Sequence, residues 1–379
     1  MKKQSLLIII LISITIGCYS QPGGRAGRPM INRSSPEVLD DKSVIFRFFA
    51  PEAEDVKLSA EFLQEPLSMI RDTTGLWTIK TDPVKPDIYP YFFLVDGIQV
   101  QDPGNVLYFS NERFKRSLVD IPGETPLVHS LKDVPHGSVT YCDYYSDIFK
   151  GYRPLVIYTP PEYDKNSEKK YPVFYLISGT TDTEETYFKV GRTNLILDNH
   201  LAEGKVEPMI VVMPYGNPSV PGATATNPPA PGDQINEDPI ENDLINNIIP
   251  YVESNYRTLN DNDNRAIGGF SRGGGQTLRI GFKHPELFSW ICSYSSFLGK
   301  EDFEKNFRNV YEDPERTNEQ MKLLWISVGN EDFLYEQTVE FMDLLKEKNI
   351  NFESMVTSGG HTWMNMKQFM DKSSQLLFK

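Results

Sequence analysis

The sequence predicts two folded domains: an all-β sandwich, then an α/β domain with a mostly parallel sheet and helices on both faces. Three observations predict this arrangement. Short alternating apolar runs, separated by turn residues, occupy the first third of the 379 residues. From about residue 138, apolar strands alternate with helical patterns. One of these strands ends at a serine set among glycines, at residues 268–276.

The beginning of the chain predicts an export signal. Two lysines precede an apolar run, 6–16, which is too short to span a bilayer but suits a secretory signal peptide at 1–20. Two processing routes stay open. The stretch TIGC resembles a bacterial lipobox, so Cys18 could carry a lipid anchor, or cleavage could follow Ser20. Either route predicts an exported protein, whether periplasmic, an outer-membrane lipoprotein or secreted.

The sandwich domain is predicted for residues 31–128. A flexible lead-in rich in glycine, at 21–30, precedes it, and a linker at 129–137 follows it. Within the domain, apolar and polar residues alternate at the two-residue period of half-buried strands. The predicted strands are 43–51, 55–62, 76–82 and 89–97.

The α/β domain is predicted for residues 138–379. Apolar residues at helical spacing predict a helix over 238–257, in which Pro250 predicts a kink or an early end. The proline-rich stretch 215–234 has no period and predicts a long loop, either functional or mobile, whose role stays open. The predicted buried strands are 153–160, 171–178, 208–214, 264–270, 289–295 and 322–329.

Composition excludes one class of partner and indicates no metal site. A net charge of −14 repels phosphates, so nucleic acid is not an expected ligand. Of the three cysteines, Cys18 belongs to the signal or its anchor. Cys142 and Cys292 could form one disulfide, but two buried free thiols are favoured. Their spacing is not that of a zinc site, and no cofactor is expected.

The serine among glycines predicts a nucleophile. Gly269, Ser271 and Gly273 form the pattern G-x-S-x-G between the predicted strand 264–270 and a helix. In this context the pattern is the nucleophile elbow of the α/β-hydrolase fold, whose strained turn admits only small neighbours. The alternative, a flexible glycine–serine loop, is disfavoured by the strand and the helix on either side. The sequence therefore predicts the α/β-hydrolase fold.

A serine nucleophile needs a base and an orienting acid, which in this fold follow in the order Ser, acid, His, each after a strand. His361 lies in a glycine turn after the predicted strand NFESMVTS, and is the predicted base. Asp332 follows the strand 322–329 and is the predicted acid, with Glu331 as its competitor. The remaining histidines are interpreted as capping or surface residues: His129, His136, His200 and His284.

The oxyanion of the reaction needs backbone N–H donors. Arg272, directly after the nucleophile, is predicted to supply one of them. The second is expected from the turn after strand 171–178, at Gly179 or Thr180, with Thr180 favoured. An ordinary surface turn is the alternative there. These residues together predict hydrolysis of an ester through an acyl-enzyme, with His361 taking the serine proton.

The α/β domain resembles a known family. Residues 138–379 resemble the esterase D and enterochelin esterase-like group, and within it carbohydrate esterase family 1, through YPVFYLISG, ENDLINNIIPYVESNYR, IGGFSRGG, NEDFLYE and SGGHTW. Ser271, Asp332 and His361 fall on the family's triad positions. Members usually carry His-Gly where this chain has SG at 178–179. Because the donors are backbone groups, this departure need not affect activity.

The first domain resembles the early-set sandwich of the family 48 carbohydrate-binding modules, through VIFRFFAPEAEDVKLSA, GLWTIKT and YPYFFLVDGIQVQDPGN. The two domains together are similar to exported feruloyl esterases of polysaccharide-degrading gut Bacteroidetes. The resemblance implies ferulate esterified to arabinose on xylan as substrate, and thus a plant cell-wall polysaccharide as partner. Trp77, Tyr89 and Tyr91 are candidates for stacking on sugars, but Trp77 and at least one tyrosine are expected to be core.

The expected function is a secreted serine esterase that removes feruloyl or related groups from arabinoxylan. The substrate pocket is expected near Trp363, Tyr215 and Asn217. An acetylxylan esterase, which needs only a small acyl pocket, stays open as an alternative. A siderophore esterase of the enterochelin type would need basic residues, which the acidic composition disfavours. A surface glycan-binding protein without activity would be indicated by a lost triad residue, and all three are present.

Overall fold

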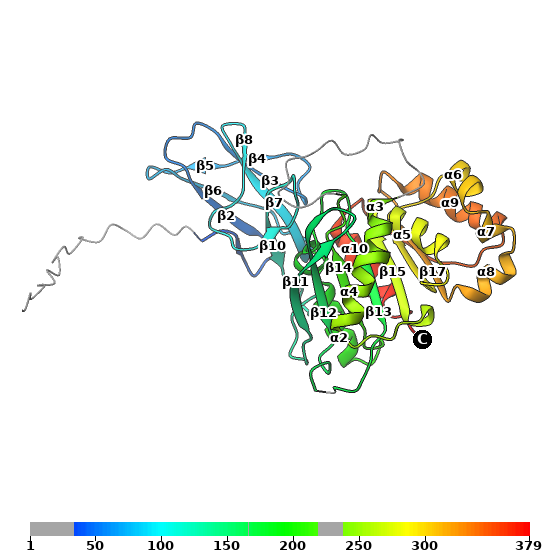
Figure 1. The fold of residues 1–379 in the computed structure, drawn as a ribbon. Coiled ribbons are helices and arrows are strands. Elements are labelled where there is room, and N and C mark those ends of the chain that lie inside the picture. The colour runs from blue at the N-terminus through cyan, green and yellow to red at the C-terminus, as the bar shows by residue number, and fades with distance from the viewer. Residues whose placement is uncertain (1–33, 166, 219–237) are drawn as a thin grey trace, which may run out of the picture.

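The computed structural model describes residues 34–165, 167–218 and 238–379 (Figure 1). The predicted signal peptide, the lead-in, the anchor at Cys18 and most of the predicted 215–234 loop lie outside these residues. In the described part of the chain, none of the helices combines the length and the apolar character needed to cross a lipid bilayer. Cys142 is partly buried and Cys292 is buried, and both are free thiols.

The first domain consists of two antiparallel sheets packed face to face. Between them lie the inward residues of alternating strands, such as Val44 and Phe46 on one sheet and Val56 and Leu58 on the other. One sheet contains β1 (Glu37–Val38), β2 (Val44–Phe49), β6 (Leu76–Lys80) and β5 (Ile70–Arg71). The other contains β4 (Leu67–Ser68), β3 (Val56–Ala60), β7 (Asp87–Val95), β10 (Arg116–Ile121) and β9 (Tyr108–Phe109), with β8 (Ile98–Val100) paired to β7.

The three aromatic residues considered for sugar stacking belong to the sandwich core. Trp77, Tyr89 and Tyr91 are 7%, 4% and 0% exposed. Their polar atoms are bonded inside the domain, since the Trp77 indole N–H donates to the Ala50 carbonyl at 2.9 Å and the Tyr91 hydroxyl donates to Asp102 at 2.7 Å. None of the three therefore offers a ring face to a glycan.

The second domain is built on one eight-stranded sheet, in the order β11-β12-β14-β13-β15-β16-β17-β18. The first two pairings are antiparallel and all the others are parallel. The predicted fold class, an α/β domain of the hydrolase type behind a sandwich, is confirmed. The strands are β11 (Ser138–Ser146), β12 (Gly151–Thr159), β13 (Val173–Ile177), β14 (Ile210–Pro214), β15 (Arg265–Phe270), β16 (Trp290–Tyr294), β17 (Leu323–Gly329) and β18 (Glu353–Thr357).

Helices cover both faces of this sheet (Figure 1). Three of them pack on the face that also meets the sandwich: α1 (Thr186–Lys189), α2 (Thr193–Ala202) and α10 (Trp363–Ser373). The opposite face carries α3 (Pro239–Asp243), η1 (Leu244–Ile248), α4 (Ile249–Asn255), α5 (Arg272–Lys283), α6 (Lys300–Asn306), α7 (Arg308–Tyr311) and α9 (Tyr335–Glu347). The remaining short helices are η2 (Asn262–Asn264) and α8 (Pro314–Gln320).

One of the two expectations for the helix around Pro250 was an early end at the proline. The structure shows instead that the helix continues past it. Helical backbone continues from α3 through η1 to α4, and η1 is a π-helical segment directly before the proline. Proline lacks the N–H that an α-helix would bond to the carbonyl four residues earlier. A wider π turn accommodates this loss without breaking the helix.

A buried ion pair joins the two domains. Lys367 on α10 is 2% exposed, and its ammonium lies 2.5 Å from the Asp87 carboxylate of β7. His129 lies beside the same carboxylate. Burial is the main reason that the pKa of its imidazole is lowered to about 4. Ile88 and Leu118 of the sandwich complete the apolar core on this face of the large sheet. The two domains are therefore joined by a buried ion pair and by shared apolar packing.

Two of the four histidines outside the predicted triad differ from expectation. His129 and His200 are 6% and 3% exposed, so they are buried rather than capping or surface residues. His200 lies 2.7 Å from Asp371 of α10. His136 and His284 are more exposed, and they pair with Asp198 and Glu241. Each of the four thus has a carboxylate partner in the fold.

Candidate active site

Ser271 occupies a sharp turn between β15 and α5. Its φ of 59° and ψ of −121° lie outside the backbone regions that residues other than glycine prefer, so the turn is strained. The glycines around it explain how the turn closes. A Cβ on Gly273 would lie 2.2 Å from the carbonyl oxygen of Ile177, and a Cβ on Gly269 would lie 2.3 Å from the backbone of Gly273. The G-x-S-x-G pattern is therefore a packing requirement of this turn.

The Ser271 hydroxyl is not used to hold the fold. Its backbone N–H donates to the Tyr294 carbonyl at 2.9 Å, which anchors the turn to the neighbouring strand β16. Its side chain makes no capping hydrogen bond to α5, and the residue is partly exposed. The oxygen is thus available at the N-terminal end of a twelve-residue helix, where negative charge is favoured.

The predicted base and acid are hydrogen-bonded to each other. His361 Nδ1 lies 2.8 Å from Asp332 Oδ2, and the second oxygen, Asp332 Oδ1, accepts from the Leu334 N–H at 2.8 Å. Burial raises the pKa of the Asp332 carboxyl, but these hydrogen bonds outweigh burial and lower the pKa below its usual value. Asp332 therefore stays ionised and keeps a proton on Nδ1. The competing residue, Glu331, is exposed.

Aromatic rings pack on the imidazole of His361 from two sides. The ring of Phe270, the residue directly before Ser271, stacks on the His361 ring with centroids 4.6 Å apart. Phe333, the residue directly after Asp332, covers the His361 ring at 4.6 Å. The ring is thus held by the residue before the serine and by the residue after the acid, while its Nδ1 faces Asp332. The three predicted residues follow three separate strands of the sheet, β15, β17 and β18.

The loop expected to carry the second oxyanion donor is tied to the elbow by Arg272. The guanidinium of Arg272 donates to the carbonyls of Gly179 at 3.1 Å and Gly216 at 2.9 Å. The sequence analysis assigned Arg272 a role for its backbone N–H alone. The structure adds a side-chain role, because these two bonds fix the ends of β13 and β14 beside the first turn of α5.

Within that loop, the backbone N–H groups of Gly179 and Thr180 have different surroundings. The next acidic residue, Asp182, is 5% exposed, and burial raises the pKa of its carboxyl to about 7, against a hydrogen bond from Asn111 and the nearby Gly179 N–H. Gly179 therefore directs its N–H toward a carboxyl group. Thr180 is exposed, which makes its N–H the better candidate for an oxyanion donor.

Two of the three residues expected to line the substrate pocket are part of the supporting structure instead. Trp363 is 6% exposed and packs edge-on against Tyr187 at 5.0 Å, so it is a core residue behind the site. Asn217 is 5% exposed and donates to the Asp182 carbonyl at 3.0 Å. Both side chains thus support the site from within the fold, and neither lines the cavity described below. Tyr215, although 3% exposed, does border a cavity.

The sandwich domain contributes residues that the sequence analysis missed. The Glu112 N–H donates to the Thr181 carbonyl at 2.8 Å, and Asn111 forms an antiparallel bridge with Asp182. The Asn111 amide also donates to Asp182 Oδ1 at 2.9 Å. The first domain therefore completes the hydrogen bonding of the loop that borders the serine. No local pattern marks Asn111, because its partner lies 71 residues further along the chain.

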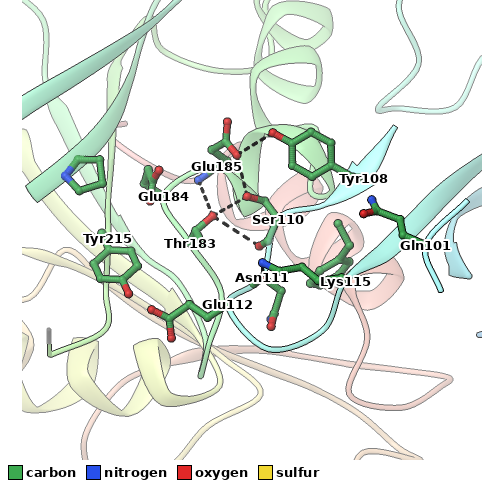
Figure 2. Close-up of a pocket in the computed structure, with 12 residues that line it drawn as sticks. Gln101, Tyr108, Ser110, Asn111, Glu112, Lys115, Thr183, Glu184, Glu185 and Tyr215 are labelled. Carbon is green, nitrogen blue, oxygen red and sulfur yellow. Dashed lines mark hydrogen bonds between the residues drawn. The ribbon is translucent and has the colours of Figure 1, made fainter. Parts of the chain in front are cut away.

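A cavity of about 710 Å³ opens between the two domains beside this loop (Figure 2). Gln101, Tyr108 and Glu112 of the sandwich form one side, and Thr183 and Tyr215 of the α/β domain form the other. Polar side chains predominate in Figure 2, and several are already bonded to one another across the domain junction. In the described part of the chain, no three His, Cys, Asp or Glu residues gather as they would to hold a metal ion.

Comparison with known proteins agrees with this geometry. The Esterase family matches residues 146–370 of the chain. A relative from Xylanibacter ruminicola, an endo-1,4-beta-xylanase/feruloyl esterase, is 28% identical over 353 residues, which are 91% of this chain and 46% of the relative. The chain thus spans about half the length of that relative, and less of two other curated relatives that it matches.

Solved structures show the same fold. The feruloyl esterase module from Clostridium thermocellum, solved as a mutant complexed with sinapinate, is 22% identical with a TM-score of 0.56, over 72% of this chain and 95% of the module. The enterobactin esterase from Shigella flexneri is 15% identical with a TM-score of 0.62, over 90% of this chain and 95% of that protein.

The family match covers more than half of the chain, including the strands, the elbow and the histidine turn described above. Its span begins at the end of β11 and ends within α10, so it coincides with the α/β domain. The chain therefore belongs to the Esterase family and is a carboxylic-ester hydrolase.

Proposed function

We propose that this protein is an exported feruloyl esterase that hydrolyses feruloyl or related hydroxycinnamoyl esters on arabinoxylan. The observation that carries the proposal is the similarity to a xylanase/feruloyl esterase over 91% of the chain, across both domains. The same chain holds a strained serine elbow and a hydrogen-bonded histidine–aspartate pair. Export is proposed on the predicted signal peptide at 1–20.

In the proposed mechanism, Ser271 Oγ attacks the ester carbonyl carbon while His361 Nε2 takes the serine proton. Asp332 accepts the hydrogen bond from Nδ1–H, which keeps Nε2 as the base and stabilises the imidazolium that forms. The imidazolium then protonates the leaving sugar hydroxyl, and the C–O bond of the ester breaks. Water, activated by the same histidine, hydrolyses the acyl-enzyme and releases the acid.

The oxyanion is stabilised in this mechanism by backbone N–H groups of Arg272 and Thr180. Arg272 is the first residue of α5, where the N–H has no partner within the helix. The Arg272 guanidinium holds the Gly179 carbonyl, and so fixes the position of the neighbouring Thr180 N–H. Donors that are rigid before the reaction stabilise developing charge at little reorganisation cost.

The proposal is tested with the protein lacking residues 1–20 and with its Ser271→Ala variant. Each is assayed on methyl ferulate and on acetylated xylan. We expect release of ferulate that falls at least about 10⁴-fold in the variant, because the nucleophile is lost while binding groups remain. Release of acetate alone would retain the nucleophile but replace the feruloyl assignment with an acetylxylan esterase. Activity on neither substrate would reject both assignments.

A further inference from the structure

Three exposed tyrosines lie on the first two strands of the large sheet, on the face that also carries α1 and the sandwich. Tyr141 and Tyr145 on β11 and Tyr152 on β12 are 55%, 49% and 68% exposed. We call these three residues the tyrosine strip. Aromatic side chains grouped on a surface in this way are typical of a binding site rather than of a solvated face. The mechanism of ester hydrolysis does not use any of them.

The strand register places the tyrosine strip on the same sheet face as the cavity. Tyr145 lies opposite Tyr152, and Asp143 lies opposite Pro154, in the antiparallel pairing of β11 with β12. Side chains two residues apart on a strand point to the same side of a sheet. Tyr145 and Tyr152 therefore share a face with Pro154, which lines the cavity. The rings of Tyr145 and Tyr152 meet with centroids 5.5 Å apart.

Tyr141 connects the strip with the cavity. Its hydroxyl interacts with Glu185, which lines the cavity, and its ring meets Phe188 of α1 edge-on at 6.5 Å. Tyr141 and Tyr145 are four residues apart on one strand, which separates them by about 13 Å. They can thus contact successive units of one extended chain that leaves the cavity.

The chemistry of the cavity fits a neutral, polyhydroxylated ligand. Gln101, Asn111 and Thr183 are uncharged polar groups that line it. The charged lining residues are one lysine and three glutamates: Lys115, Glu112, Glu184 and Glu185. Hydroxyl groups can donate to and accept from such a mixed set. The apolar faces of sugar rings in turn pack on exposed tyrosine rings. A polyanion is disfavoured by the net charge of −14.

We propose that the cavity and the tyrosine strip together bind the neutral polysaccharide backbone that carries the ester group. This inference rests on the proposed function, because it assigns the carbohydrate side of that substrate to a site. The cavity borders the loop of the second oxyanion donor, since Thr183 lines it and Glu112 bonds Thr181. The loop at 179–183 therefore connects the first turn of α5, through Arg272, with the lining of the cavity.

The test compares a variant in which all three strip tyrosines become alanine with a matched control, Val356→Ala. Val356 is 50% exposed on β18, the strand at the opposite edge of the same sheet. Two quantities are measured: kcat/KM on feruloylated arabinoxylan and on methyl ferulate, and binding of de-esterified arabinoxylan by each variant in a Ser271→Ala background. The second measurement does not depend on which acyl group the enzyme removes.

We expect the triple variant to lose at least about tenfold in kcat/KM on the polymer and in polysaccharide binding, as two or three stacking contacts disappear. Its kcat/KM on methyl ferulate and all values for Val356→Ala should stay unchanged. Equal losses on both esters, or full binding of the polysaccharide by the triple variant, would overturn the proposal. So would a smaller oligomeric mass of the triple variant than of the wild type in solution, which would identify the strip as a protein interface. If the wild type releases no ferulate but the strip is needed for binding, only the feruloyl assignment fails.

Discussion

Asp182 provides the sharpest test of how burial acts on this site. Its carboxyl is buried under the loop that carries the second oxyanion donor, and burial raises its pKa from 3.8 to about 7. In the unfolded chain the group titrates near its ordinary value. At a pH between these two pKa values, the Asp182 carboxyl is protonated in the folded state and ionised in the unfolded state. Stability therefore falls as the pH rises from about 4 to about 7.

The substitution Asp182→Asn removes this titration. Because the pKa of Asp182 rises from 3.8 to about 7 on folding, the wild-type carboxyl lowers the free energy of unfolding by about 4 kcal/mol above pH 7. At pH 5 the same effect is about 2 kcal/mol. The asparagine keeps an oxygen for the Asn111 amide. Its NH₂ group would face the Gly179 N–H, which costs about 1 kcal/mol at any pH. The diagnostic quantity is thus the gain at pH 8 minus the gain at pH 5, which we expect to be about 3 kcal/mol.

The assay is urea unfolding of the wild type and of Asp182→Asn at pH 5 and pH 8, followed by tryptophan fluorescence. Asp343→Asn is the matched control, because Asp343 lies on α9 with a side chain that is 65% exposed. The control should change stability by the same small amount at both pH values. A gain from Asp182→Asn that is equal at pH 5 and pH 8 would show that the carboxyl is ionised in the fold at both, and would refute the reasoning.

Three further substitutions test other parts of the structure. Asp332→Asn should lower kcat by about 10⁴-fold on an activated aryl ester, because the amide favours the wrong histidine tautomer, whereas exposed Glu331→Gln should leave kcat unchanged. Lys367→Met should lower the free energy of unfolding by about 3–5 kcal/mol in urea, because it leaves the Asp87 carboxylate buried without its partner; the surface variant Lys346→Met should have little effect. Gly273→Ala should abolish activity and lower the melting temperature, since its Cβ would meet the Ile177 carbonyl at 2.2 Å, while Gly299→Ala, which meets nothing within 4 Å, should behave as wild type.

The features that depend on short-range sequence patterns were predicted well from the sequence. Alternating and helical apolar periods predicted most strands of both domains and the α/β fold class. The glycines around Ser271 predicted the strained turn, because a tight backbone approach restricts residue type directly. The positions of Asp332 and His361 after consecutive strands predicted their meeting, since the carboxyl ends of parallel strands lie at one edge of a sheet. In the structure, His361 Nδ1 and Asp332 Oδ2 lie 2.8 Å apart.

The edge strand β11 of the eight-stranded sheet was harder to predict from the sequence. Strand β11, at residues 138–146, has polar and exposed aromatic side chains on much of its length, so it lacks the apolar run that marked its neighbours. Its pairing with β12 holds it in the sheet. A single sequence cannot distinguish such a strand from a loop, because its stability comes from the partner strand. The tyrosine strip was for the same reason not evident.

Only the tertiary structure decided what surrounds the serine. Trp363 and Asn217 resembled pocket residues in the sequence, yet packing buries the first and internal hydrogen bonds occupy the second. Asn111 of the sandwich meets Asp182 across 71 residues of chain. Burial at this junction raises the pKa of the Asp182 carboxyl, although the Asn111 hydrogen bond acts in the opposite direction. The sequence by itself determined the elements and the reactive residues, since these follow from local periodicity and backbone sterics. The junction cavity, the support of the oxyanion loop and the burial of Asp182 follow from contacts between distant segments, which no local pattern encodes.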